Sequence, residues 1–259
     1  MSLKTEARKA EIIKITRERS VASVDLLSDL LGVSAQTIRR DINQLCEQNI
    51  LRRRHGGAEI YDDPLNAPYD LRETLNLDAK KRISQAAAAM VPNGSIIFIS
   101  IGTTLAMVAV ALQTKKNLTV VTNNLNAAMA LSGESTNRII LPGGEVRLPD
   151  RDILGEVTPD LFGRYRADFG FYGVAGIDGD GGLLDFHRSE VEVRECIRQS
   201  SRSAVLVADH TKFGRAAPAI GGNIAECDMV VTDQRPNAAF ADLQDALGDR
   251  LIIAGETGR

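Results

Sequence analysis

A short segment, residues 34–58, constrains this chain more than any other. It reads SAQTIRRDINQL, CEQNIL and RRRHGGA in direct succession. Ile38, Ile42 and Leu45 recur at helical spacing and share one face, and Ser34 is a suitable N-cap. The arginines and the paired glycines that follow predict a short two-stranded hairpin. The segment therefore predicts an amphipathic helix followed by a basic hairpin.

Two further helices are expected before this segment. The first should span about residues 5–18, with Ile12 and Ile15 on its buried face. The second should be capped by Ser23 and should end at Gly32. Three short helices followed by a hairpin are typical of a winged helix-turn-helix.

The polar residues of the third helix point away from its apolar face. Arg can bind guanine bidentately, Gln and Asn can pair with adenine, and hairpin arginines can bind backbone phosphates. An isolated helix with this pattern could equally be a solvated surface, but here the pattern occurs beside a basic hairpin. We therefore expect contact with double-stranded DNA. The expected contact residues are Ser34, Gln36, Thr37, Arg39, Arg40, Asn43, Arg52, Arg53, Arg54 and His55.

Asp41 is the exception on this helix, because DNA phosphates repel a carboxylate. Its helical angle directs it toward the body of the domain. We expect an ion pair with a basic residue of the first helix, such as Arg8.

The charge of the chain is unevenly distributed. Residues 1–60 hold eleven Lys and Arg against eight Asp and Glu, whereas the rest holds 20 against 26. A basic N-terminal part joined to an acidic part is typical of a nucleic-acid binder with a second globular domain. No apolar run is long enough to span a membrane, so we expect a cytoplasmic protein without a membrane partner. Three scattered cysteines without a CxxC pair and three histidines predict neither a disulfide nor a metal site, and no cofactor is expected.

The expected domain order is a winged helix-turn-helix over residues 1–58, a linker over 59–77 with two prolines, and an α/β domain over 78–259. Apolar strand patterns alternate with helical patterns in the large domain, which predicts a mainly parallel sheet covered on both faces. The expected strands are 96–100, 118–122, 138–141, 169–174, 203–209, 228–232 and 250–254.

Small polar loops follow four of these strands, and ligands of parallel sheets bind at the carboxyl ends of the strands. A glycine and two threonines, residues 102–104, open a helix after the first strand, which favours a phosphate. Each loop alone could be a helix cap or a turn, but together they provide amides, carboxylates and a cation. The loops therefore predict a site for a phosphorylated, hydroxyl-rich metabolite.

TIRRDI and RRRHGGA in the first sixty residues resemble the N-terminal signature of the DeoR family of bacterial transcriptional regulators. GTT, TNN, GGE, AGID with GGL, and ADHTKFGR resemble the effector domain of that family, which is similar to sugar-phosphate isomerases. The resemblance covers nearly all of the chain. It implies a phosphate loop of Gly102, Thr103 and Thr104. The full expected effector site is Ser100, Gly102, Thr103, Thr104, Asn123, Gly143, Gly144, Glu145, Glu190, Asp209 and Lys212.

Ser100 departs from the family pattern, which commonly has an acidic residue two positions before the glycine of GTT. Three explanations of this departure remain open. The effector differs from that of the family, another acidic group replaces the missing carboxylate, or effector binding is weak.

The expected function is a transcriptional regulator, a repressor of carbohydrate metabolism genes, whose operator affinity depends on a phosphorylated sugar or sugar derivative. A homo-oligomer, dimer or tetramer, is expected, because a single winged helix covers only a short DNA site. One alternative is an isomerase-like enzyme with an added DNA-binding domain, in which Lys212 would take part in catalysis. Another is an architectural DNA-binding protein whose large domain binds no ligand.

Overall fold

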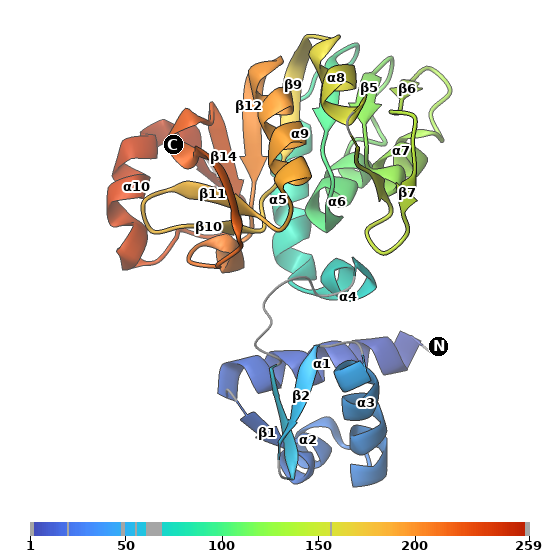
Figure 1. The fold of residues 1–259 in the computed structure, drawn as a ribbon, viewed down its shortest axis with the longest axis vertical. Coiled ribbons are helices and arrows are strands. Elements are labelled where there is room, and N and C mark those ends of the chain that lie inside the picture. The colour runs from blue at the N-terminus through green and yellow to red at the C-terminus, as the bar shows by residue number, and fades with distance from the viewer. Residues whose placement is uncertain are drawn as a thin grey trace. The chain divides into compact units, whose positions relative to one another are not determined.

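The computed structural model describes residues 3–19, 21–47, 50–54, 56–60, 69–155 and 157–256. The chain divides into two compact units, Met1–Leu75 and Asn76–Arg259. Figure 1 shows the helices and strands of each unit.

The first unit is a winged helix-turn-helix, as predicted. Its elements are α1 (Leu3–Arg19), β1 (Val21–Ser23), α2 (Val24–Leu31), α3 (Ala35–Glu47), β2 (Leu51–Arg54), β3 (Gly57–Ile60) and α4 (Tyr69–Thr74). The Ser23 hydroxyl caps α2 by accepting from the backbone N–H of Leu26, and Gly32 ends α2 with a φ of 63°. Ile12, Leu27, Ile38 and other buried residues from all three helices form one core.

A strand that the sequence analysis did not predict completes the wing. β1 pairs with β3 and β3 pairs with β2, so the sheet is three-stranded and antiparallel. β1 has only three residues, which is too few for an alternating pattern to identify. A Cβ atom at Gly57 would collide with the Ala22 carbonyl of β1, so glycine permits this close pairing.

The expected linker, residues 59–77, is not free of regular structure. Residues 61–68 lie outside the described part of the chain, but α4 occupies 69–74. Leu71 and Leu75, four residues apart, pack against the core of the first unit. Residues 69–75 of this range therefore belong structurally to the first unit, and 76–77 belong to the second.

The second unit contains a seven-stranded sheet in the order β15-β14-β12-β9-β4-β5-β6, and all of its neighbouring strands are parallel. The mainly parallel sheet is thus confirmed. Its strands are β4 (Ile96–Ile99), β5 (Thr119–Thr122), β6 (Arg138–Ile140), β9 (Ala167–Tyr172), β12 (Ser201–Val207), β14 (Met229–Thr232) and β15 (Leu251–Ile253).

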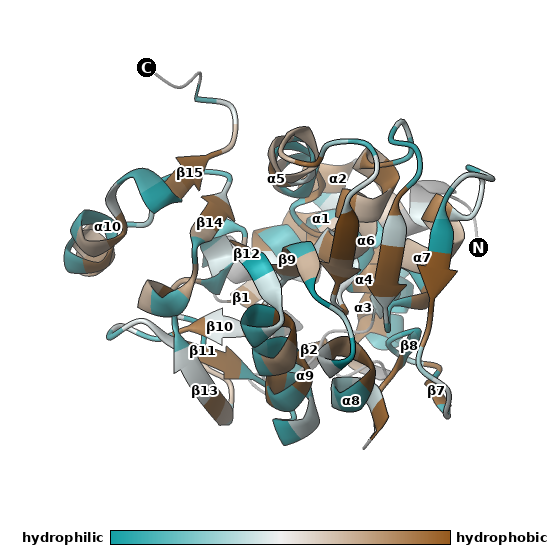
Figure 2. Cartoon of the chain, turned by 90° about the horizontal axis from the view of Figure 1, so that it is seen from above, coloured by the Kyte–Doolittle hydropathy of each residue, from teal (hydrophilic) through white to brown (hydrophobic). Residues whose placement is uncertain are grey.

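Helices cover both faces of this sheet. One face packs against α5 (Leu77–Ala89), α6 (Thr103–Ala111) and α7 (Leu125–Leu131), and the other packs against α8 (Val157–Gly163), α9 (Arg188–Gln199) and α10 (Ala241–Leu247). Successive strand residues point to opposite faces, so Ile97 and Ile99 contribute to one core and Phe98 to the other. Figure 2 shows apolar residues concentrated in the central strands and hydrophilic residues on α9.

Two small antiparallel sheets were not predicted. One pairs β10 (Gly176–Ile177), β11 (Gly182–Asp185) and β13 (Ala219–Asn223), and the other pairs β7 (Val146–Arg147) with β8 (Asp152–Ile153). Strands of two to five residues are too short to give a clear periodicity. Within the described ranges, every helix is too short or too polar to cross a bilayer.

Candidate DNA-binding surface and effector site

Helix α3 presents its predicted polar residues as the sequence suggested. Ile38 is fully buried, whereas Gln36, Arg39 and Arg40 are exposed. The Ser34 hydroxyl accepts from the backbone N–H of Thr37 at 3.3 Å and lies 2.9 Å from the Thr37 hydroxyl. Ser34 therefore caps α3, and the two arginines are available on its outer face.

Asp41 is buried and forms the expected ion pair with α1. Its carboxylate accepts from the Arg8 guanidinium, with 2.6 Å between Oδ2 and Nε and 3.3 Å between Oδ1 and Nη2. The hydrogen bond to Asp41 contributes most to a raised pKa of Arg8, with burial acting against it. The hypothesis that Asp41 joins α3 to α1 is confirmed.

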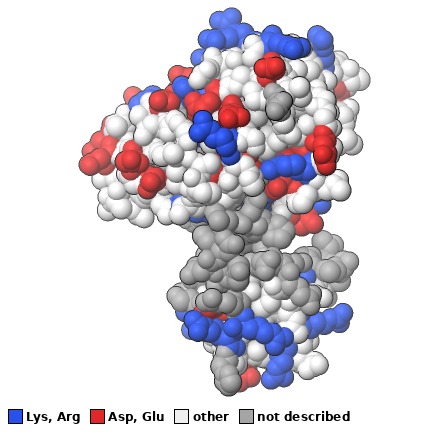
Figure 3. Space-filling view, in the orientation of Figure 1, with Lys and Arg blue, Asp and Glu red and all other residues white. Residues whose placement is uncertain are grey.

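The wing places its arginines in two different environments. Arg53 donates to the Asn43 amide oxygen of α3, and Arg54 pairs with Glu59 on the neighbouring strand. Asn43 thus holds the wing arginine in addition to its predicted role at DNA. The Arg52 side chain and His55 lie outside the described residues. Figure 3 shows Lys and Arg gathered on the visible face of this unit.

The predicted phosphate loop lies where the strand order of the large sheet reverses. From β4 the chain continues outward to β5 and β6, and then returns to build β9, β12, β14 and β15 on the other side of β4. In open parallel sheets, ligands bind in the crevice at such a reversal. Residues 100–104 follow β4 at this position, beside β9.

The backbone of this loop is suited to an anion. Gly102 precedes α6 with φ 108° and ψ 161°, a conformation that only glycine adopts easily, and no side chain caps the helix. The first N–H groups of a helix have no acceptor within it and carry partial positive charge. Thr103 and Thr104 are mostly buried in the first turn. The loop can therefore bind a phosphate with backbone N–H groups.

Two buried asparagines follow β5, and one of them is bound to this loop. Asn124, which was not in the predicted site, donates to the carbonyls of Ser100 and Gly102 at 3.2 and 3.1 Å. Asn123 is fully buried and donates to the Ile153 carbonyl at 3.1 Å, but its Oδ1 atom accepts no hydrogen bond from the residues described. A buried acceptor without a donor costs about 1–3 kcal/mol. A ligand hydroxyl would satisfy it.

The β7–β8 hairpin adds a residue that the sequence analysis missed. Arg147 binds Asp152 through two hydrogen bonds of 2.7 Å and reaches Glu190 at 3.2 Å. The other Glu190 oxygen accepts from the backbone N–H groups of Phe186 and His187, so Glu190 caps α9. Glu190, a predicted effector residue, is thus engaged in the protein, and Arg147 is the neighbouring cation.

The predicted glycine pair directly precedes the same hairpin in the chain. Gly143, Gly144 and Glu145 are exposed residues between β6 and β7. A Cβ atom on Gly144 would lie 3.5 Å from the Ile153 side chain, near the carbonyl that Asn123 binds. The structure therefore places Gly144 beside Ile153, to which Asn123 is bound, and it leaves Gly143 and Glu145 at the surface.

Asp209 and Lys212 follow β12, one strand beyond β9. Asp209 is buried and accepts from the backbone N–H of Thr211 at 3.0 Å. Burial disfavours its charged carboxylate. The positive charge of Lys212, the hydrogen bonds from Thr211 and the positive charge of Lys80 outweigh burial and hold the pKa of Asp209 below its usual range. Neighbouring strands are about 4.8 Å apart and only β9 separates β12 from β4, so the two loops follow strands about 10 Å apart. A small ligand could contact both.

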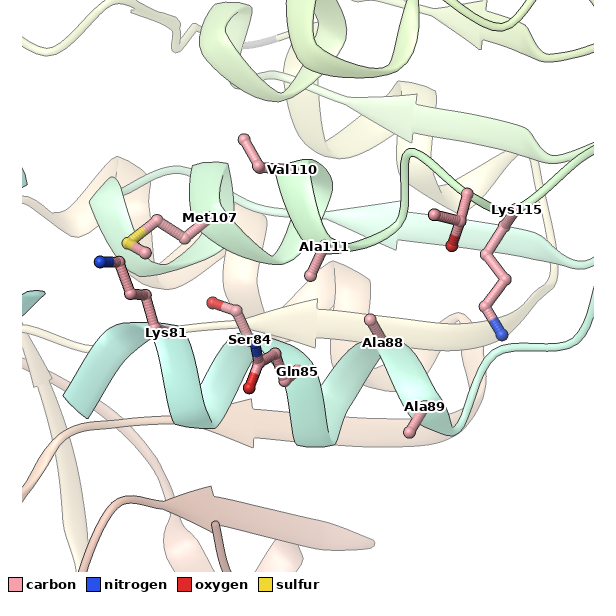
Figure 4. Close-up of a pocket in the computed structure, with 10 residues that line it drawn as sticks. Lys81, Ser84, Gln85, Ala88, Ala89, Met107, Val110, Ala111 and Lys115 are labelled. Atoms are coloured by element: carbon pink, nitrogen blue, oxygen red, sulfur yellow. The ribbon is translucent and has the colours of Figure 1, made fainter. Parts of the chain in front are cut away.

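A separate groove of about 410 Å³ lies between α5 and α6 (Figure 4). Ala88, Ala89, Met107, Val110 and Ala111 form its apolar part, and none of the predicted effector residues lines it. Among the side chains that the structure describes, no three His, Cys, Asp or Glu residues are grouped to hold a metal ion.

Comparison with known proteins identifies both units. Residues 8–63 match the family described as the DeoR-like helix-turn-helix domain, and residues 75–234 match the DeoR C terminal sensor domain. The glycerol-3-phosphate regulon repressor of Escherichia coli (strain K12) is 44% identical over 234 residues, which cover 90% of this chain and 93% of that protein. The repressor of the same name from Haemophilus influenzae is 41% identical over 254 residues, covering 98% and 99%.

A solved structure similar to part of the chain is ribose 5-phosphate isomerase A from Methanocaldococcus jannaschii. It is 15% identical, with a TM-score of 0.39, over 53% of this chain and 55% of the isomerase.

The helix-turn-helix and the matched sensor domain define a DNA-binding transcriptional regulator. The chain belongs to the DeoR family. The predicted family is thus confirmed, and the named repressors among its relatives support a regulator over an isomerase-like enzyme.

Proposed function

We propose that this protein is a repressor that releases its operator when a small phosphorylated polyol binds the second unit. Glycerol 3-phosphate is the first candidate, because two extensively similar relatives are named as repressors of a glycerol-3-phosphate regulon. Residues 1–58 would bind DNA, 78–259 would bind the effector, and 59–77 would connect them.

The observation that carries the proposal is the start of α6. Gly102 leaves the first turn of α6 without a side-chain cap, at the reversal of the strand order. A phosphate bound to Thr103 and Thr104 would accept from these backbone N–H groups. Lys212 would supply the opposite charge from the loop after β12.

Ser100 and Asn123 suit a ligand that carries both a phosphate and a hydroxyl group. Ser100 is 4% exposed at the end of β4 and is neutral, so no carboxylate at this position repels the phosphate. The unsatisfied Asn123 Oδ1 would accept a hydrogen bond from a ligand hydroxyl. Gly143, Gly144, Glu145, Glu190 and Asp209 would complete the site, with Arg147 beside Glu190.

On DNA, we propose that Arg40, with Gln36 and Arg39, reads base edges from α3. Ser34, Thr37, Asn43, Arg52, Arg53, Arg54 and His55 would position the domain on the backbone or the groove edge. A dimer or tetramer would bind repeated half-sites.

Calorimetric titration with sn-glycerol 3-phosphate, glycerol and inorganic phosphate tests the effector site. We expect saturable binding of the phosphate ester and none of glycerol, because the phosphate provides the charged contacts. Thr103→Ala with Thr104→Ala removes the two hydroxyl groups beside these backbone N–H groups and should weaken binding, whereas Thr114→Ala, on an exposed residue, should not. Absence of binding by every phosphorylated polyol would overturn the proposal.

A further inference from the structure

Asn76 is the first residue of the second unit and has an uncommon backbone conformation. Its φ is 52° and its ψ is 37°, and it directly precedes α5. Among residues with a side chain, asparagine tolerates this left-handed region best. The conformation fixes the direction in which the chain enters α5.

The Asn76 side chain is bound to the loop that follows β12. Its Nδ2 atom donates to Asp209 Oδ1 at 3.2 Å and to Thr211 Oγ1 at 3.3 Å. Both acceptors are far away in sequence but lie in the loop that also carries Lys212. Asn76 is therefore in direct contact with one predicted effector residue and with the neighbour of another.

A second set of contacts joins α5 to the same loop. Asp233 accepts from the His210 backbone N–H at 2.8 Å, lies 2.9 Å from the His210 ring, and pairs with Arg82 of α5 at 3.5 Å. Lys80, also on α5, is buried close enough to Asp209 to favour its charged form. The first turns of α5 are thus attached to the 209–212 loop at several points.

On its other side, Asn76 is covalently joined to the DNA-binding unit. Leu75 immediately precedes it and packs, with Leu71, against the core that also holds the buried face of α3. Leu75 and Asn76 are consecutive residues, so the backbone at Asn76 is the covalent connection between the second unit and the first.

We propose that Asn76 is a positioning residue that couples effector binding to operator affinity. The inference rests on the proposed function, in which Asp209 and Lys212 contact the phosphorylated effector. When the effector engages this loop, the two acceptors of Asn76 move or change their partners, and the entry into α5 changes with them. Linkage requires that the effector and the operator each alter the affinity of the other by the same factor.

Asn76→Gly tests this role, because glycine adopts the left-handed backbone readily and lacks the side-chain amide that binds Asp209 and Thr211. Three quantities are measured: binding of sn-glycerol 3-phosphate without DNA, binding of DNA from upstream of the gene, and DNA binding at saturating effector. Allosteric factors are typically about 5- to 150-fold. We expect the first two affinities to stay within about twofold of wild type, and the ratio of the two DNA affinities to fall close to one.

Asn117→Gly is the matched control. Asn117 is exposed and also left-handed, with a φ of 58°, and it lies away from the 209–212 loop, before β5. It should retain the wild-type ratio. Thr211→Ala removes one acceptor of Asn76 and should lower the ratio partially, which decides the question if Asn76→Gly does not fold.

The outcomes separate the two proposals. If wild type binds DNA and no phosphorylated polyol changes that binding, the proposed function fails and the coupling role fails with it. If wild type responds and both Asn76→Gly and Thr211→Ala respond equally well, the coupling role alone is overturned.

Discussion

The Asp41 carboxylate of α3 is bound by the Arg8 guanidinium of α1, with 2.6 Å between Oδ2 and Nε. The Asp41 side chain is 3% exposed and that of Arg8 is 20% exposed, so water screens the pair only partly. The pair fixes the helix that carries the predicted base-reading residues to the first helix of its unit.

Asp41→Asn should destabilise the first unit by about 1–3 kcal/mol, because the charged hydrogen bonds to Arg8 are lost or weakened. Urea denaturation, with hydrogen exchange at the amides of α1 and α3, measures this change. Asp29→Asn, at an exposed position of α2, should have little effect. Equal stability of Asp41→Asn and wild type would show that the pair contributes nothing.

Arg40→Ala should weaken binding to the operator by about 1–3 kcal/mol and reduce its preference over random DNA, because Arg40 is exposed on the outer face of α3. Arg53→Ala should weaken binding to operator and to random DNA by similar factors. It should also lower the slope of log affinity against log salt concentration by about one. Fluorescence anisotropy at several salt concentrations distinguishes them, with Arg164→Ala in the second unit as the control. Equal losses on operator and random DNA for Arg40→Ala would rule out base reading.

Gly102→Ala should abolish the effector response and cost about 1–3 kcal/mol, because the side chain strains a backbone at φ 108° and ψ 161°. Strain is the cause, since the nearest atom to the added Cβ is 3.9 Å away. Thermal shift with sn-glycerol 3-phosphate measures both effects. Gly133→Ala, where nothing lies within 4 Å, is the control. A normal shift in Gly102→Ala would place the phosphate elsewhere.

Arg147→Lys should destabilise the β7–β8 hairpin, because lysine cannot form the two parallel hydrogen bonds to the buried Asp152. We expect the second unit to lose about 1–3 kcal/mol and residues 146–153 to exchange their amide hydrogens faster. Arg188→Lys is a matched change in an exposed pair with Glu192 and should be nearly neutral. Unchanged exchange in the hairpin would contradict this role of Arg147.

Periodicity and caps were sufficient to predict much of the fold. Ile38, Ile42 and Leu45 identified the buried face of α3, and Ser23 and Gly32 marked the ends of α2. The seven parallel strands were predicted from apolar runs between helices. The three residues of β1 and the two-residue strands β7 and β8 were not, because strands this short show no alternating pattern.

The site was predicted less completely than the fold. A glycine and an amide residue directly after strands pointed to Gly102 and Asn123, because strand ends converge in any parallel sheet. Arg147 and Asn124 were missed, and so was Asn76, which contacts the site's residues from outside it. Their roles depend on contacts with residues such as Glu190, Ser100 and Asp209, which come together only in the folded chain.

The most direct test of the central claim is fluorescence anisotropy of the full chain on DNA from upstream of its gene, titrated with sn-glycerol 3-phosphate and other sugar phosphates. The account predicts salt-dependent, sequence-specific binding that one phosphorylated polyol weakens by about 5- to 150-fold. Specific binding that no phosphorylated compound alters would contradict it.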